Sequence, residues 1–248
     1  MFSLEIDCHP DDHDLLVAEL WELGCEGIVE LAPDSLRAFF DDSVPLRTLR
    51  ERYPGARERR EEPRDWVQAS RDLLQPTPVG RRFFLVPVWR DDPAPTGRIR
   101  LTVNPGMAFG TGFHESTQLS IEALEDFVRP GDAVLDVGTG SGILARVAAH
   151  LGAARVAACD TDPDAIRIAG IGFIGSAEAV ASSSADVVVA NINPEAIAAL
   201  APDLLRIRRP EGAILLSGIE SHELDTLLAA LPKPREIRRK NNWVLLVL

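Results

Sequence analysis

The stretch LDVGTGSG, residues 135–142, decides the fold of this chain. It overlaps the end of an apolar run, Ala133–Val137, that is typical of a buried strand, and an alanine-rich helical pattern over Ile143–Leu151 follows it. Glycines between a strand and a helix let a ligand approach the backbone at the carboxyl edge of a parallel sheet. We therefore expect a ligand-binding turn at residues 138–142.

The spacing of the glycines narrows the choice of ligand. Gly138, Gly140 and Gly142 form the pattern G-x-G-x-G, whereas the dinucleotide fingerprint G-x-G-x-x-G would need its third glycine at Ile143. No lysine follows the turn, which excludes a phosphate-binding P-loop. A tight turn that only packs against its neighbours remains the alternative on spacing alone.

An acidic residue at the end of the next strand favours an adenosine-type ligand. The strand expected over Arg155–Cys159 is followed by Asp160, 22 residues after Gly138, where a carboxylate can accept both hydroxyls of a ribose. Asp162 precedes Pro163 and is interpreted as a helix N-cap. A ribose-binding carboxylate without a phosphate-binding loop fits S-adenosylmethionine, which has a ribose and an adenine but no phosphate.

An asparagine after the most strand-like run, Ser184–Ala190, suggests chemistry on an amine. The side-chain oxygen of Asn191, with backbone carbonyls, can take the hydrogen bonds of an incoming amine and leave its lone pair free. Asn193 stands before Pro194 and is interpreted as a helix N-cap. Asn191 is therefore the candidate catalytic residue.

Strands and helices alternate from about residue 101 onward, which is typical of a parallel sheet with helices on both faces. We therefore predict an α/β domain over residues 101–248. The further expected strands are Ala213–Ser217 and Trp243–Leu248, and the further expected helices are Glu195–Arg208 and His222–Leu231.

Two further parts precede this domain. Residues 1–60 show the order strand, helix, strand, strand, helix and predict a small α+β domain. Residues 61–100 are interpreted as a connector with a helix over Asp65–Leu74 and a strand over Phe83–Trp89. The Arg/Glu run at residues 57–64 is interpreted as a solvated edge or a linker.

The charge of the chain is negative and unevenly placed. Its 248 residues include 26 basic and 38 acidic ones, a formal charge of −12, which disfavours a broad basic face for nucleic acid. Residues 1–42 alone hold twelve acids and one base. This acidic segment is either a solvated surface or a field that attracts a basic protein partner.

The sequence predicts a cytoplasmic protein. Its first eight residues, MFSLEIDC, contain two acids and no basic region, so we expect no signal peptide, and no run of about 18 apolar residues predicts a membrane span. The three cysteines, Cys8, Cys25 and Cys159, are far apart and odd in number, which favours a reducing compartment and no zinc site.

Residues 104–117, NPGMAFGTGFHEST, are too rich in glycine for the interior of an element, and they could cover a bound ligand as a lid. His114 and Glu115 begin like the zinc motif H-E-x-x-H, but residue 118 is Gln. His114 is therefore interpreted as a hydrogen-bonding loop residue, and no metal site is predicted.

Five motifs together resemble the ribosomal protein L-eleven methyltransferases. The resemblance runs from about residue 65 to the end of the sequence. The first motif is specific to that family, whereas the glycine turn is shared by class I methyltransferases in general. The motifs are NPGMAFGTGFHEST at 104–117, VLDVGTGSGILA at 134–145, DTDPDAI at 160–166, VVANI at 188–192 and LLSGI at 215–219.

This resemblance implies a Rossmann-like, seven-stranded methyltransferase domain, preceded by a ferredoxin-like domain that recognises a large-subunit ribosomal protein. It implies contacts to S-adenosylmethionine from Thr117, Gly138, Asp160 and Asn191, to which we add Gly140 of the same turn. It also implies transfer of methyl groups to lysine or α-amino groups, with Asn191 facing the acceptor amine. We expect a monomer with no direct nucleic-acid or membrane partner.

Three features depart from the family pattern. Asn104 stands where the family usually has an acid, and Ser70 stands where a second tryptophan often follows Trp66. The crossover between residues 160 and 190 is shorter by about ten residues, although a parallel crossover needs about a dozen including its helix. Because the helix expected over Pro163–Ala169 has only about two turns, we expect a thinner wall on the adenine side.

Two other functions remain open on the sequence. One is a class I methyltransferase that acts on a small molecule or a nucleic acid, and the other is a binding protein that lost catalysis through the short crossover. The net charge disfavours nucleic acid, and the acidic first domain favours a basic protein over a metabolite.

Overall fold

The structure, a computed structural model, describes residues 1–9, 13–32, 34–61, 74–104 and 112–248. The chain divides into two compact units, Met1–Leu74 and Gln75–Leu248. The helix expected over Asp65–Leu74 lies outside the described residues apart from Leu74, as do residues 105–111 of the expected lid. Among the described residues, no helix is long and apolar enough to span a bilayer.

In its described residues up to 61, the first unit forms a four-stranded antiparallel sheet with two helices. Its strand order is β2-β3-β1-β4, and its element order, β-α-β-β-α-β, is that of ferredoxin-like units. Leu4, Leu36 and Phe40 from the sheet pack against Leu20 and Leu49 from the helices. The elements are β1 (Phe2–Asp7), α1 (His13–Glu22), β2 (Cys25–Ala32), β3 (Ser35–Phe40), α2 (Leu46–Arg52) and β4 (Arg57–Arg60).

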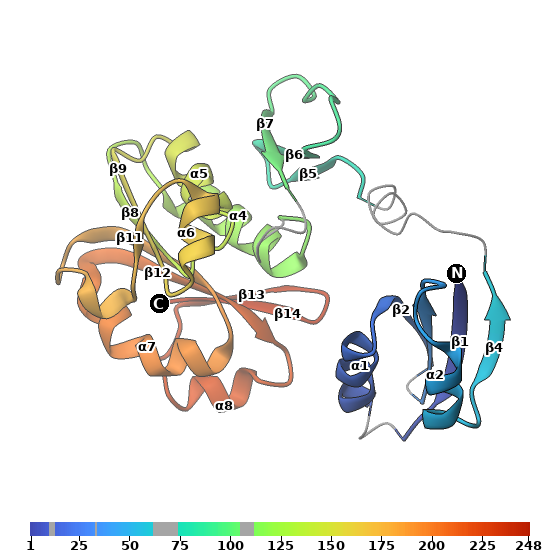
Figure 1. The fold of residues 1–248 in the computed structure, drawn as a ribbon. Helices are drawn as coiled ribbons and strands as arrows, with labels where there is room; N and C mark the ends of the chain where they lie inside the picture. The colour runs from blue at the N-terminus through green and yellow to red at the C-terminus, as the bar shows by residue number, and fades with distance from the viewer. Residues whose placement is uncertain (10–12, 33, 62–73, 105–111) are drawn as a thin grey trace. The chain divides into compact units, whose positions relative to one another are not determined.

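The predicted seven-stranded sheet is confirmed in the second unit (Figure 1). Its order is β10-β9-β8-β11-β12-β14-β13. The first five of these strands run parallel, and β14 pairs antiparallel with both of its neighbours, β12 and β13. The strands are β8 (Ala133–Val137), β9 (Arg155–Asp160), β10 (Phe173–Ile174), β11 (Ala185–Asn191), β12 (Arg208–Glu220), β13 (Glu236–Lys240) and β14 (Trp243–Val247).

Helices cover both faces of this sheet, because its strands bury alternate side chains on each side. Val134, Val189 and Leu215 belong to the core that includes α4 and α5, whereas Leu135 and Leu216 belong to the core that includes α7 and α8. The helices are α4 (Glu115–Phe127), α5 (Ile143–His150), α6 (Pro163–Ala169), the 3-10 helix η2 (Ala177–Ala179), α7 (Pro194–Ile207) and α8 (Leu224–Leu228).

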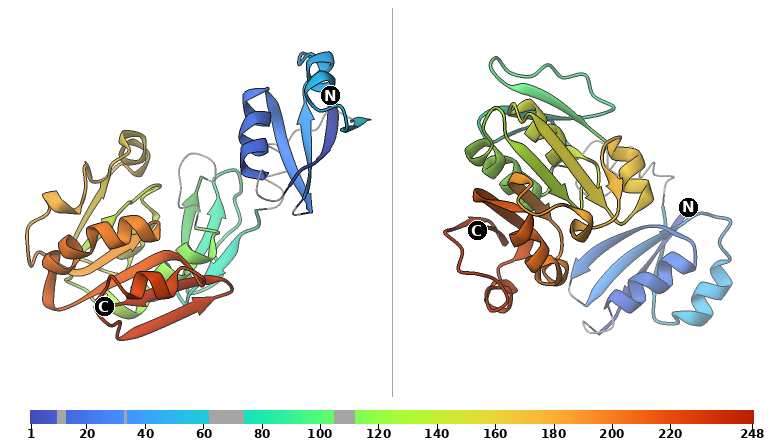
Figure 2. Two further views of the ribbon diagram at one scale, coloured as in Figure 1. Left: turned by 90° about the horizontal axis from the view of Figure 1, so that it is seen from below. Right: turned by 90° about the vertical axis from the view of Figure 1, so that its left-hand side faces the viewer.

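A three-stranded sheet, β5 (Thr77–Val79), β6 (Phe83–Pro87) and β7 (Ile99–Val103), packs on the α4 and α5 side (Figure 2). The buried carboxylate of Glu125 on α4 accepts the backbone N–H groups of Arg81 and Arg82, each at 2.7 Å. Since buried donors need partners, this carboxylate anchors the β5–β6 turn to α4.

The structure corrects one sequence interpretation: residues 104–117 are not all loop, because α4 begins at Glu115. β13 is a strand that the sequence pattern did not predict. Residues 57–60 form the exposed edge strand β4, in agreement with the solvated edge expected there. The short crossover still closes, because α6 ends at Gly170 in the left-handed conformation and β10 then pairs with β9.

Candidate functional site

The glycine turn follows β8 at the carboxyl edge of the sheet. Gly138 and Gly140 have φ angles of 69° and 53°, in the left-handed region that favours glycine. A Cβ atom at Gly138 would overlap the side chain of Ile192. The backbone carbonyl of Cys159 accepts N–H groups from Gly138 and Thr139, at 2.9 and 3.1 Å, so the turn is tied to the end of β9.

Asp160 lies beside this turn at the end of β9. Its Oδ2 accepts the N–H of Gly140 at 2.9 Å, and its Oδ1 accepts the N–H of Asp162 at 3.0 Å. An ionised carboxylate has about four acceptor positions, so two hydrogen bonds leave room for two hydroxyl groups. Asp160 and Gly140 therefore lie side by side at this edge of the sheet.

Asp136 is a feature of this edge that the sequence interpretation did not select. It is fully buried in β8, and its Oδ2 accepts the hydroxyl of Thr139 at 2.7 Å and the N–H of Ala145 at 3.0 Å. Its Oδ1 is buried and has no hydrogen-bond partner among the described residues. Burial raises the pKa of Asp136 to about 6. In the sequence, Asp136 could have been recognised as a carboxylate inside the apolar run Ala133–Val137.

Asn191, at the end of β11, is held by a residue 74 positions away. Its Nδ2 donates to Oγ1 of Thr117 at 3.1 Å, and Thr117 is buried in the first turn of α4. A Cβ atom at Gly218 would lie 3.1 Å from Oδ1 of Asn191. The amide nitrogen thus faces α4, and the amide oxygen lies on the side of Gly218, where β12 turns at a bulge.

The first turn of α4 is also fixed by residues of β12 and β14. Nδ1 of His114 accepts the N–H of Ser116 at 3.3 Å and caps the helix, and its ring meets the indole of Trp243 edge to face at 4.4 Å. The hydroxyl of Ser217 donates to the carbonyl of Ser116 at 3.0 Å. His114 is therefore a hydrogen-bonding residue, as predicted, and it braces the helix turn that carries Thr117.

Two predicted helix caps are confirmed. Oδ1 of Asp162 accepts the N–H of Asp164, and Oδ1 of Asn193 accepts the N–H of Ala196, each at 2.8 Å. Both side chains are thus occupied by helix ends, whereas Asp160 and Asn191 keep acceptor positions for a ligand. Within the described ranges, no three His, Cys, Asp or Glu side chains are placed to hold a metal ion.

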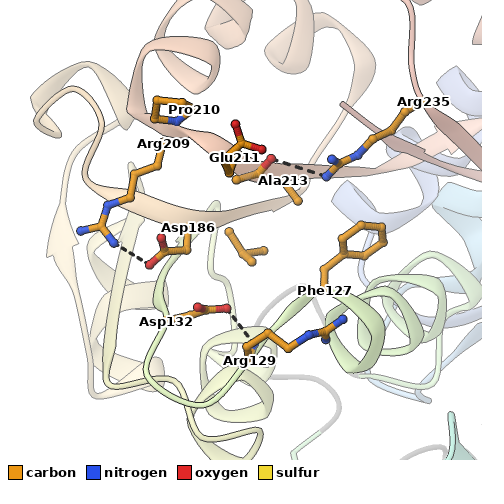
Figure 3. A pocket seen from close by; sticks show the side chains of 11 residues that line it. Phe127, Arg129, Asp132, Asp186, Arg209, Pro210, Glu211, Ala213 and Arg235 are labelled. Carbon is orange, nitrogen blue, oxygen red and sulfur yellow. Dashed lines mark hydrogen bonds and ion pairs between the residues drawn. The ribbon is translucent and has the colours of Figure 1, made fainter.

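A hollow of about 530 Å³ lies at the opposite, amino edge of the sheet (Figure 3). Two of its charged side chains pair with each other, Arg209 and Asp186 at 2.7 Å, and the carboxylate of Asp132 accepts the backbone N–H of Arg129 at 2.7 Å. None of the predicted site residues lines it. We place the candidate site at the carboxyl edge, because the chemistry of the side chains, and not the size of the hollow, indicates a ligand.

Comparisons with known proteins agree with the motifs. A family model described as "Ribosomal protein L11 methyltransferase (PrmA)" matches residues 47–248. Two relatives named ribosomal protein L11 methyltransferase are similar. The one from Symbiobacterium thermophilum is 39% identical over 203 residues, 76% of this chain and 67% of the relative. The one from Pelotomaculum thermopropionicum is 41% identical over 179 residues, 67% of this chain and 58% of the relative.

A solved structure is similar as well. The crystal structure of ribosomal protein L11 methylase from Lactobacillus delbrueckii subsp. bulgaricus matches with a TM-score of 0.64 and 30% identity, over 70% of this chain and 97% of that chain. The aligned part of this chain thus spans nearly all of that solved chain, but only 58% to 67% of the two relatives in sequence.

Proposed function

The chain belongs to the ribosomal protein L11 methyltransferase family, and on that basis we propose that it transfers methyl groups from S-adenosylmethionine to amino groups of a large-subunit ribosomal protein. One observation carries the proposal: the neighbouring strands β9, β8 and β11 end in Asp160, the glycine turn and Asn191. A carboxylate suited to a ribose and an amide suited to an amine thereby flank one turn.

The residues of this edge fit the cofactor. Asp160 keeps acceptor positions for ribose hydroxyls, and the turn of Gly138 and Gly140 brings backbone rather than side chains to the ligand. Asp136 accepts the hydroxyl of Thr139 in this turn, and in its ionised form it would favour a cationic ligand there. When bound, S-adenosylmethionine supplies a methyl group on a positively charged sulfur.

Asn191 is the residue that we assign to the acceptor amine. Because Thr117 takes one N–H of its amide, the amide oxygen is free to accept an N–H from the substrate. An amine held in this way keeps its lone pair for the methyl group, and such positioning is the main requirement of a displacement reaction. The amine must be neutral, so a lysine, whose ordinary pKa is about 10.4, needs desolvation more than an α-amine, whose ordinary pKa is about 7.7 to 8.0.

The first unit recognises the substrate in this proposal. Residues 1–42 carry twelve acids and one base, and a field of this sign accelerates encounter with a basic protein. The proposal also places the enzyme in the cytoplasm, as a monomer that engages neither nucleic acid nor membrane directly.

Intact mass spectrometry tests the proposed function. Recombinant ribosomal protein L11 is incubated with the full chain and S-adenosylmethionine, and we expect mass increases in whole methyl steps. The variant Asn191→Ala should lower turnover about 100-fold and leave cofactor binding, measured by calorimetry, within about threefold. Methylation of a small molecule but not of the protein would contradict the substrate assignment, and no cofactor binding at all would contradict enzymatic function.

A further inference from the structure

The two edges of the four-stranded sheet differ in chemistry. At one edge, β4 presents Arg57, Glu58, Arg59 and Arg60, all exposed. Charged side chains of this kind protect an edge strand from pairing with other chains. β2 forms the other edge. Its Val29 and Leu31 are exposed apolar side chains, with exposed fractions of 40% and 44%.

The exposure of Val29 follows from the alternation of side chains along β2. Ile28 packs against the core of the first unit, and successive side chains of a strand point to opposite faces. Val29 therefore lies on the face away from that core, where its register partner on β3 is Arg37. Within the described part of the chain, β2 pairs only with β3, so the backbone groups of its outer side remain available to another strand.

Other sheet edges in the described residues lack this combination. β10 exposes Phe173 and Ile174, but it is two residues long. β13 exposes Ile237 at 42%, but this residue lies among Glu236, Arg238 and the other charged residues of that strand. β2 is eight residues long; it includes Glu26 and Glu30, and its register with β3 is irregular near both ends, but its exposed Val29 and Leu31 are apolar. Exposed apolar side chains on a strand of this length persist in a stable protein when the edge serves as a binding surface.

Charge indicates which partner would bind there. The segment that contains β2, residues 1–42, has an excess of eleven acids over bases. A second copy of this chain would bring the same negative charge to the edge, and like charges oppose such pairing. A basic protein would instead be attracted. This argument favours a basic partner over self-association, and we take that partner to be the ribosomal protein substrate of the proposed function.

We propose that the outer edge of β2 binds an extended segment of the ribosomal protein substrate as an added strand. Backbone hydrogen bonds along β2 supply affinity, and contacts with Val29 and Leu31 fix the register of the added segment. The surrounding acids raise the rate of encounter. This proposal rests on the proposed function and names the surface of the first unit that performs recognition.

The test compares the same substitution at two edges. The double variant Val29→Lys/Leu31→Lys places charges on β2, as on the protected edges, and Ile237→Lys makes the matching change on β13 of the second unit. The probe is recombinant ribosomal protein L11, and its Kd is measured by calorimetry. We expect the β2 variant to bind L11 at least about tenfold more weakly, whereas Ile237→Lys changes the Kd less than about twofold. Both variants should bind S-adenosylmethionine like the wild type, which checks the fold of the second unit. The β2 variant should also unfold in urea with the same first-unit transition as the wild type, which checks the fold of the first unit.

Hydrogen exchange provides a second measurement that needs no variant. Addition of L11 should slow exchange of the backbone amides of β2 and leave those of β4 unchanged. Equal L11 affinity of the wild type and the β2 variant, or protection confined to other strands, would overturn the docking site while methylation of L11 still upheld the function. A wild type that methylates no L11 would overturn both. A wild-type dimer that the β2 variant converts to a monomer would assign the edge to a second copy instead.

Discussion

Aspartates lie at both edges of the seven-stranded sheet, but their hydrogen-bond and ion-pair partners differ. At the amino edge, Asp186 pairs with Arg209 and accepts the N–H of Ala133, so its charge is satisfied within the protein. At the carboxyl edge, Asp136 keeps an oxygen without a partner among the described residues, and the hydrogen bonds of Asp160 come from neutral backbone N–H groups. The amino edge has a hollow of about 530 Å³ (Figure 3) and the unpartnered buried Nε of Arg208, whereas the carboxyl edge has the unpartnered Oδ1 of Asp136 and the open acceptor positions of Asp160. The chemistry of the groups, carboxylate oxygens beside a glycine turn, is the better guide to a ligand site.

The largest expected effect comes from removing the same functional group at each edge. Asp160→Ala should weaken binding of S-adenosylmethionine about 100-fold or more, because two hydrogen bonds to a charged acceptor, worth about 1.5 to 3 kcal/mol each, are lost. Asp186→Ala should leave the Kd within about twofold. Isothermal calorimetry measures both. Equal weakening would mean that the two edges do not differ as we describe.

The next effect concerns stability and the buried Asp136. Because burial raises its pKa to about 6, ionisation of Asp136 costs folding free energy. Its contribution to stability is therefore complete below about pH 4 and is lost as the pH rises through about 6, a loss of about 2 to 3 kcal/mol. Asp136→Asn cannot ionise. Urea unfolding of both proteins at pH 4 to 7 should show the wild type losing stability relative to the variant, and parallel curves would contradict the raised pKa.

A smaller effect separates the two roles that Thr117 can have. In Thr117→Val the amide of Asn191 loses its partner, so we expect turnover to fall about tenfold while the Kd of S-adenosylmethionine changes less than about twofold. Thr117→Ser keeps the hydroxyl and should restore most of the rate. Ser120→Ala, which removes another buried hydroxyl from α4, is the matched control. Parallel losses of turnover and cofactor affinity would instead make Thr117 a cofactor contact, as the family resemblance implies.

The smallest effect belongs to the amino edge. The pair of Arg209 and Asp186 is partly exposed to solvent, and such pairs contribute at most about 1 kcal/mol. Arg209→Gln should therefore change the free energy of unfolding by less than about 1 kcal/mol and leave cofactor binding unchanged. Chemical denaturation with calorimetry of the same samples checks this. A large loss of cofactor affinity would connect the hollow to the site.

The sequence predicted those parts of the site that directly follow apolar strands. Asp160 and Asn191 could be found in this way, and the caps Asp162 and Asn193 were recognisable from the prolines after them. Each of these signals is local, because strand ends and helix starts are set by neighbouring residues. The roles of Asp160, Gly138, Gly140 and Asn191 toward a ligand remain predictions.

The sequence could not predict the part that α4 plays. Its buried side includes Ser116, Thr117, Ser120 and Glu125, so the hydrophobic period of a helix is masked by polar residues. Ser116, Thr117 and Glu125 have partners elsewhere in the fold, namely Ser217, Asn191 and the β5–β6 turn, whereas Ser120 bonds within the helix. Pairing over such distances depends on the completed fold and leaves no local pattern. The strand β13 was missed for a related reason, since its side chains are mostly charged and its backbone alone pairs it with β14.

The position of β14 in the sheet has a consequence for biosynthesis. This strand lies between β12 and β13, although it is the last of the three in the chain. The second unit therefore cannot close its sheet until residue 247 has been synthesised. Translation at about 5 to 20 residues per second needs about 10 to 35 s to pass from residue 74 to that point. During this interval the first unit can already be folded. The nascent chain then exposes the outer edge of β2 before the second unit has folded.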